Sequence, residues 1–209
     1  MKTSIPALIL PGLILLGCSQ GAAPGSPAPT PQGEGSGESS LMVAAGYGTL
    51  LQDAITPRLE GGSLQIKVTP LEEWVIRLTA PDTYNRLQGL GETYGPRAAL
   101  TAMAGDASLF LVSLFSYQPD VTYEPEELLL VNRGLRFRPL GIAPITPSWG
   151  TQRLAQQETR MAIYAFDESL DLTADLVVEY KMLRNDGWRE QILPLLDAER
   201  AKVRARGGR

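Results

Sequence analysis

"SLFLVSLFSY", residues 108–117, is the stretch that decides the fold class of this chain. Its large apolar side chains fall at both odd and even positions, and many are aromatic or β-branched, the types that favour strands. A strand that is apolar on both faces has packing on either side of its sheet. The stretch therefore predicts a central strand of a layered β structure.

Neighbouring segments carry weaker versions of the same signal. Residues 63–68 alternate, with Leu64, Ile66 and Val68 on one face, which is typical of a half-buried strand. Two later segments, residues 159–166 and 176–183, predict further strands. The chain therefore contains at least four strand candidates besides the hairpin described next.

A hairpin is predicted where residues 128–131 run into Asn132, Arg133 and Gly134 and return as residues 135–140. Asn and Gly tolerate the positive φ that tight hairpin turns require. In this register Leu135 and Phe137 face the core, and Arg136 and Arg138 face solvent.

Two helices are expected between the strand at residues 63–68 and the strand at residues 108–117, and one more after the last strand. The run "TPLE", residues 69–72, has the form of a capping box with proline at the first helical position, and a short amphipathic helix is expected to follow it. A second helix is expected from Pro81 to Gly89 or Gly91. After residue 187 a final helix carries apolar residues at helical spacing, and Pro194 must kink or restart it. These apolar residues are Trp188, Ile192, Leu195, Leu196 and Val203.

Strands without intervening helices after residue 107 favour an antiparallel β-sandwich. We therefore expect a mainly β fold, an immunoglobulin-like antiparallel β-sandwich with inserted short helices and a C-terminal helix. The alternative is an α+β roll, in which helices cover one face of a single sheet.

Composition narrows the chemistry that the chain can perform. The 209 residues carry a net charge of −4, include no histidine and include one cysteine. A zinc site of thiolate or imidazole type and a catalytic triad with histidine are therefore excluded. The acidic balance also argues against a nucleic-acid partner. We expect no cofactor, no metal, no catalytic residue and no enzymatic activity.

Two acidic clusters are the remaining candidates for chemistry. The first, Asp120, Glu124, Glu126 and Glu127, is interpreted as solvated loop acids, with an acid/base pair of the glycosidase type as the alternative. The second is interpreted as an acidic loop, with calcium binding as the alternative, although it lacks the spacing of an EF-hand. It comprises Asp167, Glu168, Asp171 and Asp175.

Two further features allow a structural or a binding interpretation. Trp149, in "PITPSWG", either plugs one end of the sandwich or meets a partner. The basic C-terminal tail either complements the dipole of the final helix or contacts anionic lipid. Its basic residues are Arg200, Lys202, Arg204, Arg206 and Arg209.

The N-terminus has the composition of a secretory signal. An apolar run, residues 5–16, follows Lys2 and contains Pro6 and Pro11. It is shorter than the 20 or so residues needed to span a membrane. It ends in Leu15-Leu16-Gly17-Cys18, which resembles the lipobox of bacterial lipoproteins. In that class the signal is removed before the cysteine and lipid is attached to its sulfur.

The resemblance implies three parts. Residues 1–17 would be a lipoprotein signal peptide, and residues 18–40 the lipidated Cys18 with a linker rich in Gly, Ser and Pro, a composition typical of disorder. Residues 41–209 would be one globular domain whose final helix ends in basic residues. In that class an aspartate directly after the cysteine retains the protein in the inner membrane. This chain has Ser19 at that position, which implies an outer-membrane position facing the periplasm.

Within that domain, the succession from "VTPLEEWVIRL" to "YEPEELLLVNRGLRFRPL" resembles uncharacterised bacterial lipoproteins with an immunoglobulin-like domain. That resemblance implies no activity. We therefore expect an envelope lipoprotein, held in the membrane through Cys18, that acts as a non-catalytic interaction or structural module with an envelope protein as its partner. The alternative is a periplasmic small-ligand or sugar-binding lipoprotein.

Overall fold

The computed structural model of this protein describes residues 46–103 and 106–207. The predicted signal peptide, Cys18 and the linker lie outside the described residues, and the statements about them remain predictions.

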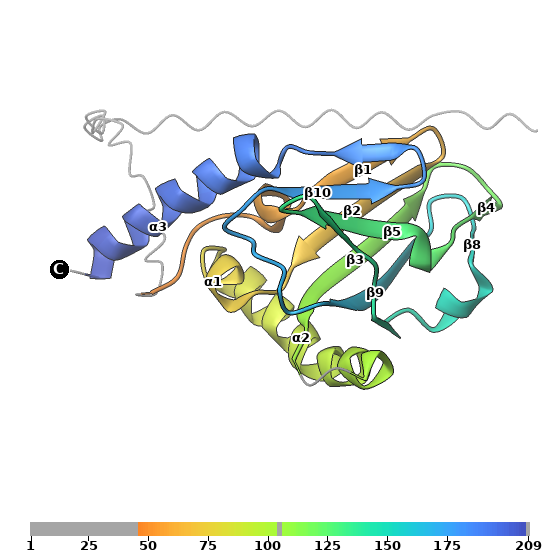
Figure 1. The fold of residues 1–209 in the computed structure, drawn as a ribbon, viewed down its shortest axis with the longest axis horizontal. Helices are drawn as coiled ribbons and strands as arrows, with labels where there is room; N and C mark the ends of the chain where they lie inside the picture. The colour runs from red at the N-terminus through yellow and green to blue at the C-terminus, as the bar shows by residue number, and fades with distance from the viewer. Residues whose placement is uncertain (1–45, 104–105, 208–209) are drawn as a thin grey trace, which may run out of the picture. The chain divides into compact units, whose positions relative to one another are not determined.

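Five strands form the larger sheet, in the order β1-β2-β3-β9-β7, and all neighbours are antiparallel. β3 occupies the centre of this sheet, so the prediction from residues 108–117 is confirmed (Figure 1). The strands are Arg58–Gly61 (β1), Leu64–Pro70 (β2), Ser108–Ser116 (β3), Gly141–Pro144 (β7) and Thr159–Phe166 (β9).

A second antiparallel sheet has the order β11-β10-β5-β6, and a two-stranded sheet pairs β4 with β8. The four-stranded sheet consists of Leu128–Asn132 (β5), Leu135–Phe137 (β6), Leu176–Tyr180 (β10) and Leu183–Asn185 (β11). The small sheet consists of Val121–Thr122 (β4) and Arg153–Leu154 (β8).

The two faces of β3 meet different layers, as its sequence predicts. On one face Phe110 pairs in register with Tyr164, whose hydroxyl donates a hydrogen bond to the carbonyl of Pro125, just ahead of β5, at 3.0 Å. On the other face Leu109 packs so closely against α2 that a Cβ on Gly95 would lie 2.6 Å from its Cδ1. The described residues therefore form a mainly β fold consistent with a β-sandwich, not the single sheet of the alternative.

The helices are short apart from two. The α-helices are Glu73–Ile76 (α1), Pro81–Ala102 (α2) and Leu193–Gly207 (α3). Short helical turns are Gln52–Ile55 (η1), Pro125–Glu127 (η2), Pro147–Thr151 (η3) and the π-helical turn Trp188–Ile192 (η4).

α2 is longer than predicted, because it does not stop at Gly89 or Gly91. It continues to Ala102, where Met103 adopts a left-handed conformation with φ 54°. A glycine inside a helix costs only about 1 kcal/mol relative to alanine. Burial of Leu87 and Ala98 on the two sides of these glycines keeps the helix intact.

The predicted capping box at residues 69–72 is wrong. Thr69 and Pro70 remain in β2, and the Thr69 hydroxyl shares a hydrogen bond of 2.8 Å with the hydroxyl of Thr56. α1 starts only at Glu73, and the residue ahead of it makes no capping bond through its side chain. Pairing within the sheet therefore outweighs the local helix signal.

The predicted hairpin is present, but its turn and its facing differ in detail. Arg133 and Gly134 adopt positive φ, whereas Asn132 is buried and donates two hydrogen bonds to carbonyls of the loop before β10. Leu135 is 64 % exposed, so its predicted core position is wrong.

The single strand predicted over residues 176–183 is divided in two. Tyr180 ends β10, and Leu183 starts β11 as its antiparallel partner. The intervening Lys181 has a φ of 51°, which reverses the chain and leaves Met182 exposed at the tip of the turn.

The final helix closes the core through its first half. Trp188, Ile192 and Leu196 are buried, and the Trp188 indole N–H donates to the carbonyl of Leu172 at 3.1 Å. The helix restarts where proline predicts, since Pro194 is the second residue of α3. Leu195, by contrast, is exposed.

The second half of α3 holds the first described residues, 46–50. The Glu199 carboxylate, 1 % exposed, accepts hydrogen bonds of 2.9 Å from both the N–H and the hydroxyl of Thr49. On the other side the Gly48 N–H donates to the carbonyl of Arg77 at 2.9 Å. The backbone of residue 48 lies so close to Leu78 that any Cβ there would collide with the Leu78 carbonyl. Residues 46–50 are thus bonded to α3 and to the end of α1.

Candidate functional site

The two long edges of the sandwich are built differently. At the closed edge, formed by β1 and β11, the Asn185 side chain donates to the carbonyl of Arg58 at 2.8 Å. The Leu183 side chain of β11 packs directly on Gly61 of β1, and a Cβ on residue 61 would lie only 2.7 Å from Cδ2 of Leu183. Side chains of the two sheets therefore seal this edge.

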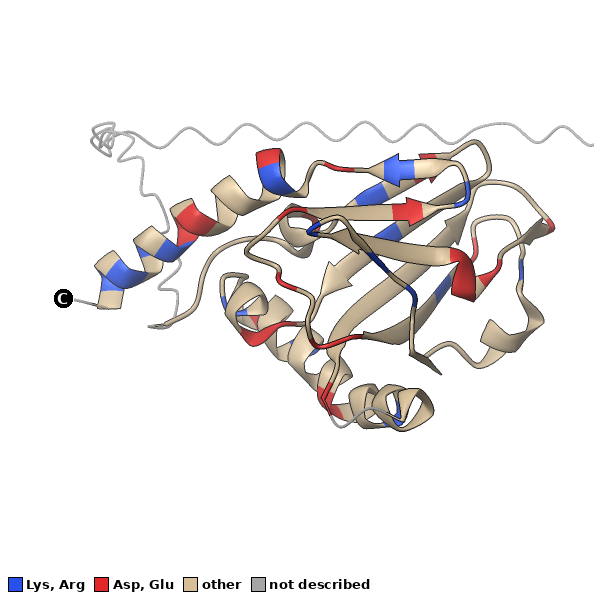
Figure 2. Cartoon of the chain, viewed as in Figure 1, with Lys and Arg blue, Asp and Glu red and all other residues tan. Residues whose placement is uncertain are grey.

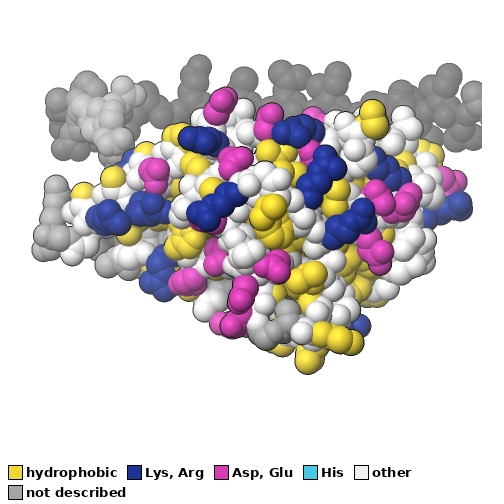
Figure 3. All heavy atoms as spheres, viewed as in Figure 1, with side chains coloured by type: hydrophobic (Ala, Val, Ile, Leu, Met, Phe, Trp, Pro, Cys, Tyr) yellow, Lys and Arg dark blue, Asp and Glu magenta, His cyan; other side chains and the backbone are white. Residues whose placement is uncertain are grey.

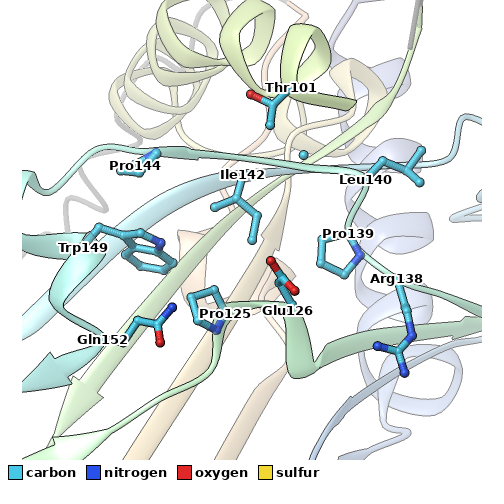
Figure 4. Close-up of a pocket in the computed structure, with 11 residues that line it drawn as sticks. Thr101, Pro125, Glu126, Arg138, Pro139, Leu140, Ile142, Pro144, Trp149 and Gln152 are labelled. Carbon is cyan, nitrogen blue, oxygen red and sulfur yellow. The ribbon is translucent and has the colours of Figure 1, made fainter. Parts of the chain in front are cut away.

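At the open edge β6 ends one sheet and β7 ends the other, with residues 138–140 passing between them. A groove of about 380 Å³ lies along this edge (Figure 4). It is lined by Thr101, Pro125, Glu126, Arg138, Pro139, Leu140, Gly141, Ile142, Pro144, Trp149 and Gln152. The volume falls within the range of about 300–1,000 Å³ that is typical of ligand pockets.

Trp149 forms one end of the groove. η3 carries it, and its ring packs edge-to-face on Tyr123 and Tyr164, with centroids 5.3 and 6.1 Å apart. Its carbonyl accepts a hydrogen bond of 2.7 Å from the Tyr123 hydroxyl. Trp149 is buried against core aromatic residues, and its indole also lines the groove, so both the structural and the binding interpretation of this residue stay open (Figure 4).

A buried arginine holds the Trp149 turn in place. Arg160 of β9 is 5 % exposed, and its guanidinium donates to the carbonyl of Ser148, to the hydroxyl of Thr151 and to Glu158, the last at 2.8 Å. Burial opposes the charge of Arg160, but the bonds with Glu158 and Tyr123 outweigh it and raise the pKa of the guanidinium. Arg160 therefore stays charged and keeps η3 fixed.

The charged groups of the groove come from two segments. Glu126 belongs to η2, at the acidic start of β5 (Figure 2), and its carboxylate lies between Pro125, Ile142 and Pro139 (Figure 4). Arg138 follows β6 and points away from Glu126 (Figure 4). A second hollow of about 250 Å³ shares Pro125, Glu126 and Gln152 with the groove and adds Glu124 and Glu127. The groove is thus lined by the Trp149 indole at one end and by Arg138 at the other, with Glu126 between them, and an acidic hollow adjoins it (Figure 4).

Exposed apolar side chains border the groove. Leu140 lines it and is 46 % exposed, and Leu135, 64 % exposed, lies on the edge strand β6 that precedes residues 138–140. Leu100 and Met103 are exposed at the end of α2, next to the lining residue Thr101. Hydrophobic side chains reach the surface in the middle and along the lower part of this face (Figure 3).

The structure separates Asp120 from the other three acids of the first predicted cluster, which line the second hollow together. Asp120 lies 3.7 Å from Arg153 in an ion pair, and Glu124 pairs with Lys181 at 2.8 Å. Only Glu126 lines the groove. Because Glu124, Glu126 and Glu127 come from one turn, they do not face one another across a cleft.

The second acidic cluster is tied into its own loop. Asp171 accepts hydrogen bonds from the N–H and the hydroxyl of Thr173, which lower the pKa of this carboxyl, and Arg133 pairs with it. Asp167 accepts from the N–H of Ser169 in the same way. Within residues 46–103 and 106–207, no three His, Cys, Asp or Glu side chains are grouped so that they could hold a metal ion.

The basic tail makes ion pairs within α3. Arg200 pairs with Asp197 at 2.8 Å and lies over the ring of Trp74, whereas Lys202 and Arg206 pair with the buried Glu199. Both interpretations of the tail stay open. No helix in the described part of the chain is long and apolar enough to cross a membrane.

Sequence reasoning missed most of the groove. Pro139 and Leu140 are predicted only as the end of the hairpin, and no strand or helix is predicted at Ile142 or Pro144. The available signal was the pair Pro139 and Pro144, since proline at both ends of a short apolar run is typical of a protected edge strand.

Known proteins offer no guide to this groove, because no family model, no curated protein and no solved structure matches the chain.

Proposed function

We propose that this protein is a lipid-anchored lipoprotein of the cell envelope that binds a partner protein at its open edge without catalysing a reaction. The anchor is Cys18, and the position is the outer membrane, facing the periplasm. The lipobox resemblance at residues 15–18 supports the anchor, and Ser19 after the cysteine supports the outer membrane.

The difference between the two edges is the observation that carries the interaction role. The closed edge is sealed by Asn185 and Leu183, whereas Leu135 and Leu140 are left exposed at the open edge. Exposed apolar side chains next to edge strands are typical of protein-binding surfaces. A partner that covers them would remove apolar area from water, which favours association.

The groups that line the groove support binding rather than catalysis. The charged and amide side-chain groups of the groove are the Glu126 carboxylate, the Arg138 guanidinium and the Gln152 amide. A glycosidase needs two carboxyl groups facing each other across the scissile bond. The neighbouring carboxylates come from the same turn as Glu126, so they do not supply the second one.

The alternative role is that of a small-ligand or sugar-binding lipoprotein. The volume of the groove and the presence of an indole beside an amide and a carboxylate favour this alternative. The two roles differ in what contacts the exposed leucines, because a small ligand fills the groove and leaves Leu135 and Leu100 uncovered.

Photo-crosslinking in intact cells tests the interaction role. A photoreactive amino acid replaces Leu140, or Leu135 on the edge strand β6, and in the matched control it replaces Met182, an exposed apolar residue on the β10–β11 turn of the closed edge. We expect the same protein, identified by mass spectrometry, to be crosslinked from positions 140 and 135 and not from 182. Equal crosslinking from all three positions, or none from 140 and 135, contradicts the proposal.

The anchor has a separate test. The Cys18→Ser variant should leave the membrane fraction, because in this class lipid is attached to the cysteine thiol. If the variant still sediments with membranes and its mature mass is unchanged, the lipoprotein assignment is wrong.

A further inference from the structure

We infer that the groove at the open edge receives an extended peptide segment of the partner that carries an apolar side chain next to a lysine or arginine. This inference rests on the proposed function, because it specifies the chemistry of the partner at the same edge. Shape, apolar lining and charge each support it.

The shape fits an extended chain better than a compact ligand. The groove and the second hollow share Pro125, Glu126 and Gln152, so the two hollows adjoin. The groove also contains β7 residues of the sheet edge, Gly141, Ile142 and Pro144. An extended peptide turns alternate side chains to the same side, so it can place one side chain in each hollow.

The first of these two hollows, the groove, takes an apolar side chain. Ile142, Leu140 and the edge of Trp149 line it together with three prolines (Figure 4). Arg160 and Tyr123 fix the indole from behind, so this hollow is preformed. A preformed apolar site binds without the cost of ordering its own side chains.

The other hollow carries more negative than positive charge, because Glu124, Glu126 and Glu127 line it and Lys181 pairs there with Glu124 at 2.8 Å. No ion pair in the described part of the chain involves Glu126 or Glu127, and Arg138 points away from Glu126 (Figure 4). A cationic side chain of the partner would supply the missing charge. Because Glu126 is exposed, such a pair contributes more to selectivity and to the rate of association than to affinity.

The edge is also protected against a second copy of this chain. Pro144 has no N–H to donate, and Pro139 limits the segment ahead of β7, which is only four residues long. Prolines and short edge strands are devices that prevent a sheet from pairing with its own kind. The same features hinder strand addition by a peptide, so we assign the peptide's binding to its side chains in the groove and not to backbone pairing with β7.

The test uses the full-length lipidated chain in detergent and three synthetic peptides. Their central residues are Leu-Lys-Leu, Leu-Glu-Leu and Ser-Lys-Ser in the same capped glycine-serine frame. We expect the Leu-Lys-Leu peptide to bind most tightly by calorimetry and to shift the Trp149 resonance in fluorotryptophan NMR. Loss of either the charge or the leucines should weaken binding.

Two variants locate the charge effect. Glu126→Lys should weaken binding of the Leu-Lys-Leu peptide by about tenfold and favour the Leu-Glu-Leu peptide, because like charges then meet in the groove. Glu60→Lys, an equal charge change on β1 at the closed edge, should leave the affinity unchanged.

Three outcomes overturn the inference. In the first, the three peptides bind equally or not at all. In the second, Glu126→Lys and Glu60→Lys weaken binding to the same extent. In the third, light scattering finds a dimer that Leu140→Ser dissociates, in which case a second copy occupies the groove. If crosslinking from position 140 still captures a partner, the proposed function stands while this inference fails.

Discussion

The same two sheets end differently at the two edges of this sandwich: side chains join the sheets at the closed edge, whereas a connecting segment separates them at the open edge. At the closed edge a side-chain amide bridges β11 to β1, and Leu183 lies tightly over Gly61. At the open edge residues 138–140 hold β6 and β7 apart, and apolar side chains stay in contact with solvent. If the open edge binds a partner as proposed, substitutions at the closed edge should affect stability and substitutions at the open edge should affect binding.

The largest effect is expected next to the closed edge, at Trp188. The indole is fully buried and bonded to Leu172, so Trp188→Ala should lower the free energy of unfolding by about 3–5 kcal/mol. Urea denaturation of the purified chain measures the change. Its control is Leu135→Ala at the open edge, and the comparison of the two edges breaks down if both variants lose similar stability.

An intermediate effect is expected at Arg160, beneath the groove. Arg160→Met removes the guanidinium donor shared by Ser148, Thr151 and Glu158, which should cost about 2 kcal/mol. Ser148 keeps a bond from the Thr151 hydroxyl and Glu158 keeps one from the Ala155 N–H. In fluorotryptophan NMR the Trp149 resonance should broaden while that of Trp188 stays sharp. Broadening of both would show that the two regions are coupled.

The effect of acid should depend on Glu199. Burial raises the pKa of this carboxyl, but bonds from Thr49 and Lys202 outweigh it, so the pKa in the folded protein lies below its ordinary value of 4.5. A lowered pKa contributes stability that is present above pH 4.5 and is lost as the pH falls through the folded-state value.

Glu199→Gln tests this assignment, because the amide keeps the shape and cannot ionise. The variant should be less stable at neutral pH, and its stability should fall less steeply than that of the parent below pH 4.5. Thermal unfolding between pH 3 and 7 measures both slopes, with Glu168→Gln in an exposed loop as the control. Parallel slopes for parent and Glu199→Gln would refute the assignment.

The smallest effect on stability is expected for Leu140→Ser at the open edge. The side chain is already 46 % exposed, and substitutions at such positions usually change stability by less than about 0.5 kcal/mol. Crosslinking of the partner from position 135 should nevertheless be lost. A variant that unfolds more easily but still binds its partner would reverse the roles given to the two edges.

The sequence predicts the sheets well wherever the signal is local and strong. β3 and β9 lie where their apolar patterns place them, because a run of β-branched and aromatic residues has no better way to be buried. Trp188, Ile192 and Leu196 likewise keep the helical spacing that predicts their burial.

The errors arise where long-range packing decides between local alternatives. Thr69 and Pro70 carry a helix signal, but their sheet partners in β3 come from about forty residues later. Lys181 turns the chain although it is neither Gly nor Asn, the residues whose presence normally indicates a positive φ. The residues next to Thr69 and next to Lys181 do not indicate the backbone conformation that the structure shows at these positions.

The groove could not be predicted because no motif encodes it. It assembles residues from α2, from η2, from the connection after β6 and from η3, which are distant in the chain. Glu126 is one of several acids in its loop, and only the position of Pro139 and Ile142 shows that its carboxylate lies in a groove (Figure 4).

The bonds made by residues 46–50 also determine how the domain bears mechanical load. A pull on the chain ahead of Gly46 acts first on Gly48 and Thr49, whose bonds lead to α1 and to Glu199 of α3. Leu50, in a parallel bridge with Thr79, takes the load next, before any of it reaches β1. None of these residues lines the groove. Such a pull would therefore strain the contacts of residues 46–50 with α1 and α3 before it reaches the groove at the open edge.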